Sequence, residues 1–358
     1  MTNGSAGLEE RQPVAYVELD GVGKRYAELA AVVDLTLSVG RGEFFSLLGP
    51  SGCGKTTTLR VIAGLEPLTT GTVAIDGCLA SSPGYTRPPE KRGVGIVFQD
   101  YALFPHLRVE ENIGFGLHGQ AKPVVAGRVA ELLELVGLGG MGKKYPHQLS
   151  GGQKQRVALA RSLAPCPSVM LLDEPFSNLD AELREGLRRE TKEILKAGGT
   201  TVILVTHDQE EAFSLSDRIG LLHAGRLEQV GTPYQVYHNP ASRFVAGFVG
   251  KVDYFPARVH GNLLVTELGT FPHYGVPAAE VVDVMVRPDD VRVFPDPQGE
   301  AVIADAQFLG AEALYRLELP NGQSLHSAGL SANLLPRGTR VRLSVDLPHT
   351  VCFPRSGQ

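Results

Sequence analysis

The sequence lacks paired cysteines, long apolar runs and an excess of basic charge, and each of these absences argues against a class of structure or function. The four cysteines are scattered and form no CxxC pair, so we expect reduced thiols of a cytosolic protein and neither disulfides nor a cysteine-bound metal. No apolar run reaches the ~18 residues that a membrane-spanning helix needs, so a role at a membrane would require a partner. The net charge of −5 offers no electrostatic support for nucleic-acid binding, and we expect no nucleic-acid partner.

Length and composition are those of an ordinary globular protein. With 358 residues, of which 43% are hydrophobic and 20% charged, the chain is long enough for one large and one small domain. Residues 1–13 contain no apolar stretch of the kind that a signal peptide has, and we expect a disordered tail there.

Apolar patterning divides the rest of the chain into two parts. Up to about residue 242, β-rich runs alternate with segments of helical spacing, which indicates an α/β fold with a parallel core sheet. The predicted strands are 14–19, 32–39, 44–48, 71–76, 93–98, 169–172 and 201–206, and the predicted helices are 55–63, 124–136, 152–163, 181–196 and 209–215.

Beyond about Arg243, short strands recur between glycines, prolines and asparagines, and helix signals are nearly absent. Such strands are predicted over 281–286, 291–294, 313–319 and 341–345. This pattern is typical of a small all-β barrel of the OB-like kind. We therefore expect an α/β domain over residues 14–242 and a β domain over residues 243–358.

A glycine-rich segment after the strand 44–48 fits the phosphate-binding pattern G-x-x-x-x-G-K-[ST]. Its glycines let backbone N–H groups surround phosphate oxygens, and the N-terminus of the next helix adds positive potential. Lys55 is expected to reach the β- and γ-phosphates, and the Thr56 hydroxyl to ligate Mg²⁺. A chance glycine-rich turn, the alternative, explains neither the strand before it nor the helix after it. The predicted nucleotide contacts here are Gly49, Pro50, Ser51, Gly52, Cys53, Gly54, Lys55, Thr56 and Thr57.

Two carboxylates end the buried strand that begins at Val169. Asp173 is expected to hold Mg²⁺, and Glu174 to act as the general base that polarises the attacking water. His207 follows the strand 201–206, at the edge where parallel sheets place their ligands, and could orient that water. An acidic surface turn and a structural histidine would explain these residues in isolation, but the phosphate-binding segment favours the catalytic interpretation.

The run Leu149-Ser-Gly-Gly-Gln153 decides between classes of phosphate-binding protein. With the glycine-rich segment and the run Leu171-Leu-Asp-Glu-Pro175, in this order, it resembles the motifs of the ABC transporter ATPases. The resemblance covers residues 14–353 and implies an ATPase coupled to transport, whose site forms between two copies in a head-to-tail dimer. The signature residues Ser150, Gly151, Gly152 and Gln153 would then contact the ATP of the partner copy. A capped helix start also explains this run in part.

Further residues match the family one by one. Tyr26 resembles the aromatic residue that stacks on adenine, with a packed tyrosine at a strand end as the alternative. Gln99 resembles the glutamine that contacts Mg²⁺ and senses the membrane subunit, and Asp180 belongs to a run that resembles the loop communicating across the dimer. His207 resembles the switch histidine. The apolar segment 101–107 could receive a membrane subunit or pack within the helical subdomain.

The segments 226–240, 244–250 and 286–291 resemble the junction to the TOBE domain of prokaryotic importers and part of that domain. The resemblance implies solute uptake with ATP and Mg²⁺, two transmembrane permease subunits, an indirect solute-binding partner, and a peripheral position at the cytoplasmic face of the cell membrane. The segments 173–180 and 351–354 are most similar to ferric-iron importers, which makes ferric iron the favoured cargo. Polyamines, sulfate, sugars and phosphonates stay open.

Two other functions are alternatives. A soluble ABC ATPase that acts on ribosomes or DNA usually fuses two ATPase units or inserts a long coiled coil, and this sequence has neither feature, nor a basic patch. A regulator with a decayed ATPase site would not be expected to retain Lys55, Asp173, Glu174 and His207. ATP turnover by the purified chain separates such a regulator from an importer ATPase.

Overall fold

The computed structural model describes residues 15–179, 181–273 and 280–355. They form two compact units: the first ends at Pro233 and the second begins at Tyr234, whereas the sequence predicts a boundary after residue 242. The tail expected over residues 1–13 lies outside the described residues, as does Asp180. Within the described ranges, no helix combines the length and the apolar character needed to cross a membrane.

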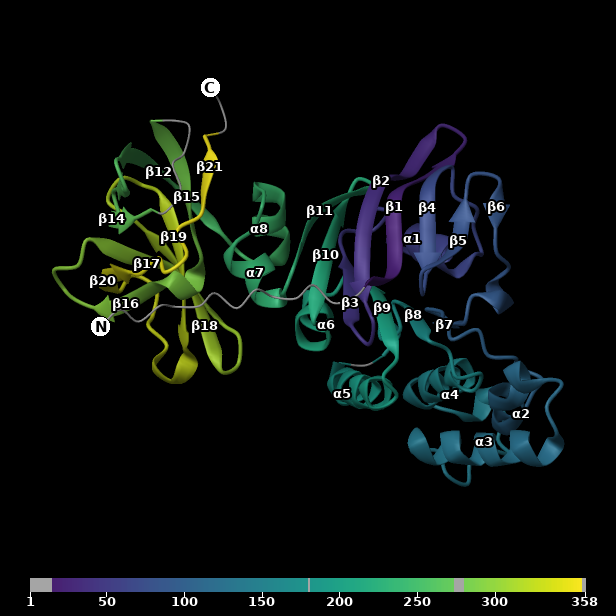
Figure 1. Cartoon of the computed structure of the whole chain (residues 1–358). Helices are drawn as coiled ribbons and strands as arrows, with labels where there is room; N and C mark the ends of the chain where they lie inside the picture. The colour runs from purple at the N-terminus through teal and green to yellow at the C-terminus, as the bar shows by residue number, and fades with distance from the viewer. Residues whose placement is uncertain (1–14, 180, 274–279, 356–358) are drawn as a thin grey trace, which may run out of the picture. The chain divides into compact units, whose positions relative to one another are not determined.

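A six-stranded sheet forms the centre of the first unit (Figure 1). Five neighbouring strands are parallel, and β11 joins β10 in antiparallel fashion at one edge. This confirms the predicted parallel core sheet. In spatial order the strands are β11 (Arg226–Gly231), β10 (Arg218–His223), β3 (Phe44–Leu48), β9 (Thr201–Thr206), β8 (Val169–Asp173) and β7 (Val94–Val97).

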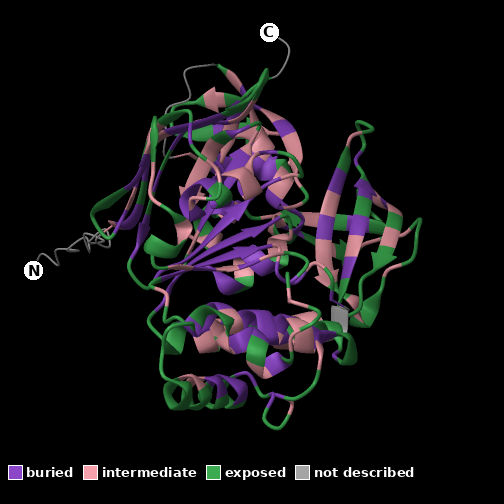
Figure 2. Cartoon of the chain, turned by 90° about the vertical axis from the view of Figure 1, so that its right-hand side faces the viewer, coloured by how far each residue is buried: buried purple, intermediate pink, exposed green. Residues whose placement is uncertain are grey.

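Residues of the central strands alternate between two apolar cores. In β8, Val169 and Leu171 belong to one core, while Met170 and Leu172 belong to the other. All five residues of β8 are buried, and Figure 2 shows the central strands of this unit in the colour of buried residues. Because both faces of the sheet are covered, its strands are continuous apolar runs rather than alternating ones.

A second, antiparallel sheet shares the first of these cores with the central sheet. Helix α1 (Lys55–Ala63) packs into the same core through Leu59, Val61 and Ile62. In spatial order the strands of the second sheet are β2 (Leu29–Gly40), β1 (Ala15–Tyr26), β4 (Thr70–Ile75), β5 (Cys78–Ser82) and β6 (Tyr85–Thr86).

The core that contains Met170 and Leu172 lies between the central sheet and a group of helices. Figure 1 shows these helices below the central strands. The helices are α2 (Val109–Gly114), α3 (Lys122–Leu135), α4 (Gly151–Leu163), α5 (Ala181–Ala197) and α6 (Gln209–Leu215). Helix α2 is not predicted by the sequence, because its six residues are too few for a helical period to stand out.

The second unit contains two five-stranded antiparallel sheets that share one apolar core, with Phe255, Val284, Ile303 and Leu317 among its buried residues. This confirms the small β domain expected from the strand pattern. The first sheet consists of β14 (Gly269–Pro272), β13 (Leu263–Thr266), β12 (Asp253–His260), β15 (Val281–Val286) and β21 (Cys352–Pro354), in that order. The second consists of β16 (Val291–Pro295), β20 (Arg340–Val345), β17 (Ala301–Phe308), β18 (Glu312–Glu318) and β19 (Ser324–Leu330).

Two short helices precede these sheets, α7 (Pro233–His238) and α8 (Arg243–Val249). The expectation that helix signals are nearly absent after Arg243 is therefore wrong for α8. The Ser242 hydroxyl caps this helix by accepting a hydrogen bond from the Val245 N–H at 3.3 Å. The buried residues Val245 and Val249 are four apart, so they lie on one face of the helix.

Candidate active site

Residues 49–54 connect β3 to α1, and two of their glycines sit where no other residue fits. Gly54 has a φ of 105°, and a Cβ atom there would lie 2.3 Å from the carbonyl oxygen of Ala31. A Cβ atom on Gly49 would lie 2.3 Å from the carbonyl oxygen of Leu222. No side chain caps α1. The start of α1 therefore offers backbone N–H donors to an anion.

Lys55 is the first residue of α1, and only 5% of it is exposed. Its ammonium group donates hydrogen bonds to the carbonyl oxygens of Gly49 at 2.8 Å and Pro50 at 3.0 Å. Beside it, burial raises the pKa of the Cys53 thiol, while the charge of Lys55 acts in the opposite direction. The ammonium group is thus fixed against the loop that would surround the phosphates.

The Thr56 and Asp173 side chains, both predicted to hold magnesium, are in direct contact. The Thr56 hydroxyl donates to an Asp173 carboxylate oxygen at 2.9 Å across 117 residues of sequence. Burial raises the pKa of the Asp173 carboxyl group, and the hydrogen bond from Thr56 opposes this shift. A hydroxyl, a carboxylate and phosphate oxygens together form the kind of ligand set that Mg²⁺ prefers.

Glu174 and His207 face each other across the ends of β8 and β9. The distance from His207 Nδ1 to Glu174 Oε2 is 3.1 Å. The Glu174 backbone has a φ of 45°, in the left-handed region. Three hydrogen bonds hold it there: its N–H donates to the Val205 carbonyl at 2.9 Å, and its carbonyl accepts from the Ser177 hydroxyl at 2.9 Å and from the Ser177 N–H at 3.2 Å. Strain of this kind is frequent at functional residues.

A buried ionic network fixes the residues on either side of His207. Arg188 of α5 donates to the Asp208 carboxylate at 2.7 Å and to the Glu211 carboxylate at 3.1 Å. The Thr206 hydroxyl donates to the other Glu211 oxygen at 2.6 Å and accepts from the Asp208 N–H at 3.0 Å. Burial raises the pKa of Glu211, and its bonds to Thr206 and Arg188 oppose that shift. Sequence reasoning missed this network, because no local motif marks it.

The phosphate-binding loop borders a cavity of about 480 Å³. Tyr26 lines this cavity and is 39% exposed, and the Lys24 ammonium lies 4.7 Å from the centroid of its ring. Glu174 also lines the cavity. Of the predicted loop contacts, Ser51, Gly52, Gly54, Lys55, Thr56 and Thr57 line the cavity.

The turn between β10 and β11 supports this cavity and was not identified from the sequence. Its residues Ala224 and Gly225 line the cavity. The Gly225 N–H donates to the Cys53 carbonyl at 3.0 Å, and the Gly225 carbonyl accepts from the Val33 N–H at 2.8 Å. The turn thereby joins the phosphate-binding loop to β2. The local signal for this turn in the sequence is Gly225, because glycine is common in turns. In the structure Ala224 and Gly225 have positive φ values of 47° and 81°.

Gln99 and the signature residues lie elsewhere in the first unit. Gln99 is exposed, and its backbone carbonyl accepts a hydrogen bond from the Asn178 side chain at 2.9 Å. Ser150 and Gln153 form a reciprocal capping box at the start of α4, with N–H to oxygen distances of 3.1 and 3.4 Å. Gly151 is exposed and Gly152 is buried. Among the described residues, none of these lines the cavity at the phosphate-binding loop of the same chain.

Comparison with known proteins agrees with this geometry. A family profile described as ABC transporter matches residues 32–177, and one described as TOBE domain matches residues 284–353. The sulfate/thiosulfate import ATP-binding protein CysA 2 of Chromobacterium violaceum is 46% identical, over 88% of this chain and 86% of that protein. This chain belongs to the ABC transporter ATP-binding proteins. The family resemblance of the motifs is confirmed, and this ABC ATPase is an enzyme that couples ATP hydrolysis to transport.

Two further relatives of the ABC ATPase are named for other cargoes. The spermidine/putrescine import ATP-binding protein PotA of Thermobifida fusca is 40% identical, over 98% of this chain and 97% of that protein. The Fe(3+) ions import ATP-binding protein FbpC 2 of Rhizobium meliloti is 44% identical, over 88% of this chain and 83% of that protein. The names of these relatives agree on import and differ in the solute.

Two solved structures match this ABC ATPase over part of its length. One is a dimeric ATP-binding cassette in a post-hydrolysis state bound to ADP and Pi; it is 34% identical, with a TM-score of 0.55, over 61% of this chain and 98% of that one. The other is a dimeric bacterial ABC transporter cassette that is 33% identical, with the same TM-score of 0.55 and the same coverage of 61% and 98%. These matches confirm the predicted ATPase fold.

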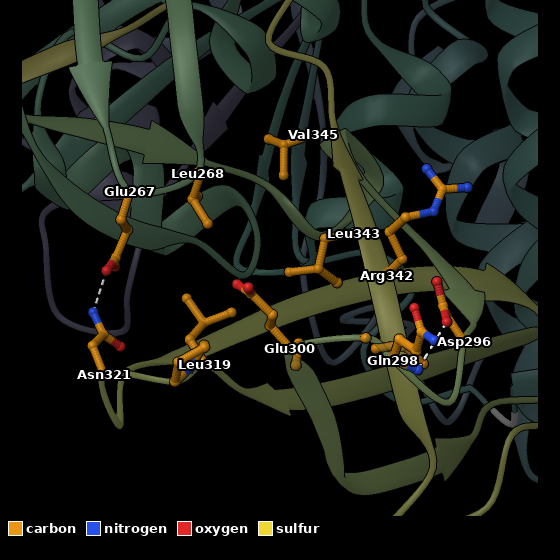
Figure 3. Close-up of a pocket in the computed structure, with 14 residues that line it drawn as sticks. Glu267, Leu268, Asp296, Gln298, Glu300, Leu319, Asn321, Arg342, Leu343 and Val345 are labelled. Carbon is orange, nitrogen blue, oxygen red and sulfur yellow. Dashed lines mark hydrogen bonds between the residues drawn. The ribbon is translucent and has the colours of Figure 1, made fainter.

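The second unit of the ABC ATPase contains a separate cavity of about 590 Å³, which the sequence does not predict (Figure 3). Carboxylates and apolar side chains line it together. Glu267 is hydrogen-bonded to Asn321, and the Glu300 carboxylate points into the space between Leu268 and Leu343. Because the lining comes from several strands and turns, no contiguous motif could have indicated it.

Proposed function

We propose that this ABC ATPase binds ATP with Mg²⁺ at the glycine-rich loop and hydrolyses it as one of two copies in a head-to-tail dimer. The observation that carries the proposal is the convergence of four side chains from three distant segments. The Thr56 hydroxyl lies 2.9 Å from the Asp173 carboxylate. Glu174 follows Asp173 in the chain, and its carboxylate lies 3.1 Å from His207 Nδ1. With Lys55 fixed in the adjoining loop, this set is suited to phosphoryl transfer from ATP to water.

Each residue then has a defined task at the substrate. Glu174 polarises the attacking water and accepts its proton on a carboxylate oxygen, and His207 holds that carboxylate through Nδ1. Lys55 stabilises negative charge on the β- and γ-phosphates, while backbone N–H groups at the start of α1 donate to other phosphate oxygens. Tyr26 stacks on the adenine ring.

Thr56, Asp173 and Gln99 are the proposed magnesium-binding residues. The chain fits such an ion, because a hydroxyl and a carboxylate already lie 2.9 Å apart beside the phosphate-binding loop. When bound, Mg²⁺ neutralises charge that develops on the phosphates during transfer. The hydrogen bond between Thr56 and Asp173 places the two oxygen ligands side by side.

The signature residues are proposed to contact the ATP of the partner copy, together with Asp180. The start of α4 is exposed at Ser150 and Gly151. The capping box uses the Ser150 and Gln153 N–H groups, so the N–H of Gly151 is the exposed donor that the helix start offers to an anion from another molecule. Neither Gly152 nor Gln153 lines the cavity of the same chain, within the part that the structure describes. The two similar cassettes of known structure are both dimeric, which supports this arrangement.

We further propose that the chain serves an importer. Two transmembrane permease subunits would carry the solute and bind this subunit at the cytoplasmic face of the cell membrane, with a solute-binding protein as an indirect partner. The import function in the names of relatives at 40% to 46% identity supports this proposal. We assign residues 14–242 to the ATPase domain and residues 243–358 to the TOBE-type domain, in which the TOBE profile matches residues 284–353.

Ferric iron is the cargo that we propose. It is supported by the similarity of segments 173–180 and 351–354 to ferric-iron importers and by the 44% identity to the iron-import protein of Rhizobium meliloti. Spermidine or putrescine and sulfate or thiosulfate are the alternatives, because relatives named for them are 40% and 46% identical.

Solute uptake in cells that lack this chain tests the proposal. Uptake of ferric iron, spermidine and sulfate would be measured before and after restoring the wild-type chain or its Glu174→Gln variant. We expect only iron uptake to fall, and only the wild-type chain to restore it. If spermidine or sulfate uptake falls instead, the cargo is different and the ATPase role stands. If Glu174→Gln restores uptake as well as the wild type, the role of Glu174 is wrong.

A further inference from the structure

The backbone that follows Gln99 adopts conformations that residues with a side chain rarely adopt. Tyr101 has a φ of 63° and Ala102 a φ of 45°, and neither is a glycine. Two consecutive residues in the left-handed region do not persist without support, so neighbouring groups must hold this turn.

Arg161, near the end of α4, supplies that support. Its guanidinium group donates to the Tyr101 carbonyl at 2.9 Å and to the Ala102 carbonyl at 2.6 Å. The same group lies 5.5 Å from the centroid of the Phe104 ring. The planar guanidinium donates to the two carbonyl oxygens from two different nitrogens held in a rigid fork, whereas an ammonium group has a single nitrogen. Arg161 is therefore a two-point support for the strained turn.

Two asparagine side chains hold the same segment on either side of the turn. Asn178, in the loop after β8, donates to the Gln99 carbonyl at 2.9 Å. Asn112 of α2 accepts from the Phe104 N–H at 2.9 Å and donates to the Phe104 carbonyl at 3.1 Å. Residues 99–104 are thus bound to three different elements of the first unit.

Arg161 and Asn178 connect the backbone near Gln99 to the signature helix α4 and to the loop after Glu174. Helix α4 begins at the signature residues and carries Arg161 eleven residues after Ser150, about 16 Å along a helix of 1.5 Å per residue. Asn178 lies four residues after Glu174. The backbone that carries Gln99 is therefore fixed with respect to both α4 and the loop that follows the catalytic carboxylate.

We infer that Arg161 is a positioning residue for Gln99, with Asn178 as a second support. By holding the left-handed turn at Tyr101 and Ala102, Arg161 sets the direction in which the Gln99 side chain leaves the backbone. This inference rests on the proposed role of Gln99 in ATP hydrolysis, and it adds that α4 determines whether Gln99 can perform that role.

The test is a double-mutant cycle between Arg161 and Gln99 on the full-length chain. Arg161→Gln is expected to lower the kcat for ATP by about tenfold with the KM for ATP within about twofold of the wild-type value. Arg161→Lys keeps the charge and one donor group, so about a threefold loss is expected. In a Gln99→Ala background, Arg161→Gln should lower the kcat by no more than about twofold further, because its effect acts through Gln99.

Amide hydrogen exchange of residues 99–104 in the chain without nucleotide gives a second readout that does not depend on activity. Exchange should be faster in Arg161→Gln than in the wild-type chain, and circular dichroism should show that the variant is folded. Arg156→Gln is the matched control on the same helix. Arg156 donates to the Val136 carbonyl at 3.0 Å and pairs with Glu190 at 2.7 Å, so its loss should leave both the exchange at 99–104 and the kcat within about twofold of wild type.

The inference is overturned if Arg161→Gln keeps the wild-type kcat and the wild-type exchange at residues 99–104. It is also overturned if Arg161→Gln lowers the kcat as much in the Gln99→Ala background as in the wild type. A Gln99→Ala variant with wild-type kcat would remove the role of Gln99 and this inference together, yet would leave ATP hydrolysis by the chain intact. Only the absence of ATP turnover in the wild-type chain would contradict the proposed function itself.

Discussion

Replacing Arg188 by methionine tests whether the ionic network beside His207 supports the first unit. The Arg188 and Glu211 side chains are only 8% and 4% exposed, so Arg188→Met leaves a buried carboxylate without its cationic partner. Losing one partner of a buried pair costs about 3–5 kcal/mol, and we expect about 3 kcal/mol here because Thr206 continues to donate to Glu211. For a unit of this size that is a fall in Tm of about 6–12 °C.

Thermal unfolding of the purified chain, followed by circular dichroism, would measure this change. The pKa of Glu211 is already raised by burial, and losing Arg188 should raise it further, so the loss of stability should be larger at pH 7.5 than at pH 5. A double variant that also carries Glu211→Leu removes the unpaired charge and should recover at least half of the loss. A Tm within about 2 °C of wild type for Arg188→Met, or a double variant less stable than the single one, would refute this reasoning.

Two other predictions concern a glycine and a buried carboxyl group. Gly54→Ala places a Cβ atom 2.3 Å from the Ala31 carbonyl oxygen and should weaken ATP binding, measured by calorimetry, by at least about tenfold. Gly77→Ala is the control, because the structure leaves open space there, and it should bind ATP like the wild type. Equal ATP affinities of the two variants would contradict this prediction. Burial raises the pKa of Asp290 to about 6, so between about pH 4 and pH 6 the native state binds a proton that the unfolded state has lost. The free energy of unfolding therefore falls as the pH rises through this range. Asp290→Asn should therefore raise the Tm relative to wild type more at pH 7.5 than at pH 4.5. The same Tm difference between variant and wild type at both pH values would contradict this.

The sequence predicts the parts of the site that depend on fixed local spacing. The strand 44–48 and the helix 55–63 have the predicted bounds, because the glycine-rich loop between them requires a strand before it and a helix after it. The contact of Thr56 with Asp173 agrees with the magnesium-binding role that is predicted for both residues. The roles of all these residues, and those of Gln99 and the signature residues, stay predictions.

The contacts that orient the site could not be predicted, because they join segments far apart in the sequence. The pairing of Arg188 with Glu211 spans 23 residues, and the bond from Gly225 to Cys53 joins a hairpin turn to the phosphate-binding loop. In the second unit, the sequence predicts β15 but not β12. Strand β12 contains Pro256 although it pairs on both sides, with β13 and β15, and proline normally argues against a central strand.

The molar mass in solution of the Glu174→Gln variant, measured in the presence of ATP and Mg²⁺, tests most directly whether a second copy completes the site. Because this variant should bind ATP without cleaving it, we predict the mass of a dimer by light scattering. Adding Ser150→Arg should return a monomer that binds ATP with unchanged affinity, since Ser150 serves the partner's nucleotide. A double variant that stays dimeric, or one whose monomer no longer binds ATP, would contradict the arrangement in which the signature of one copy faces the phosphate-binding loop of the other.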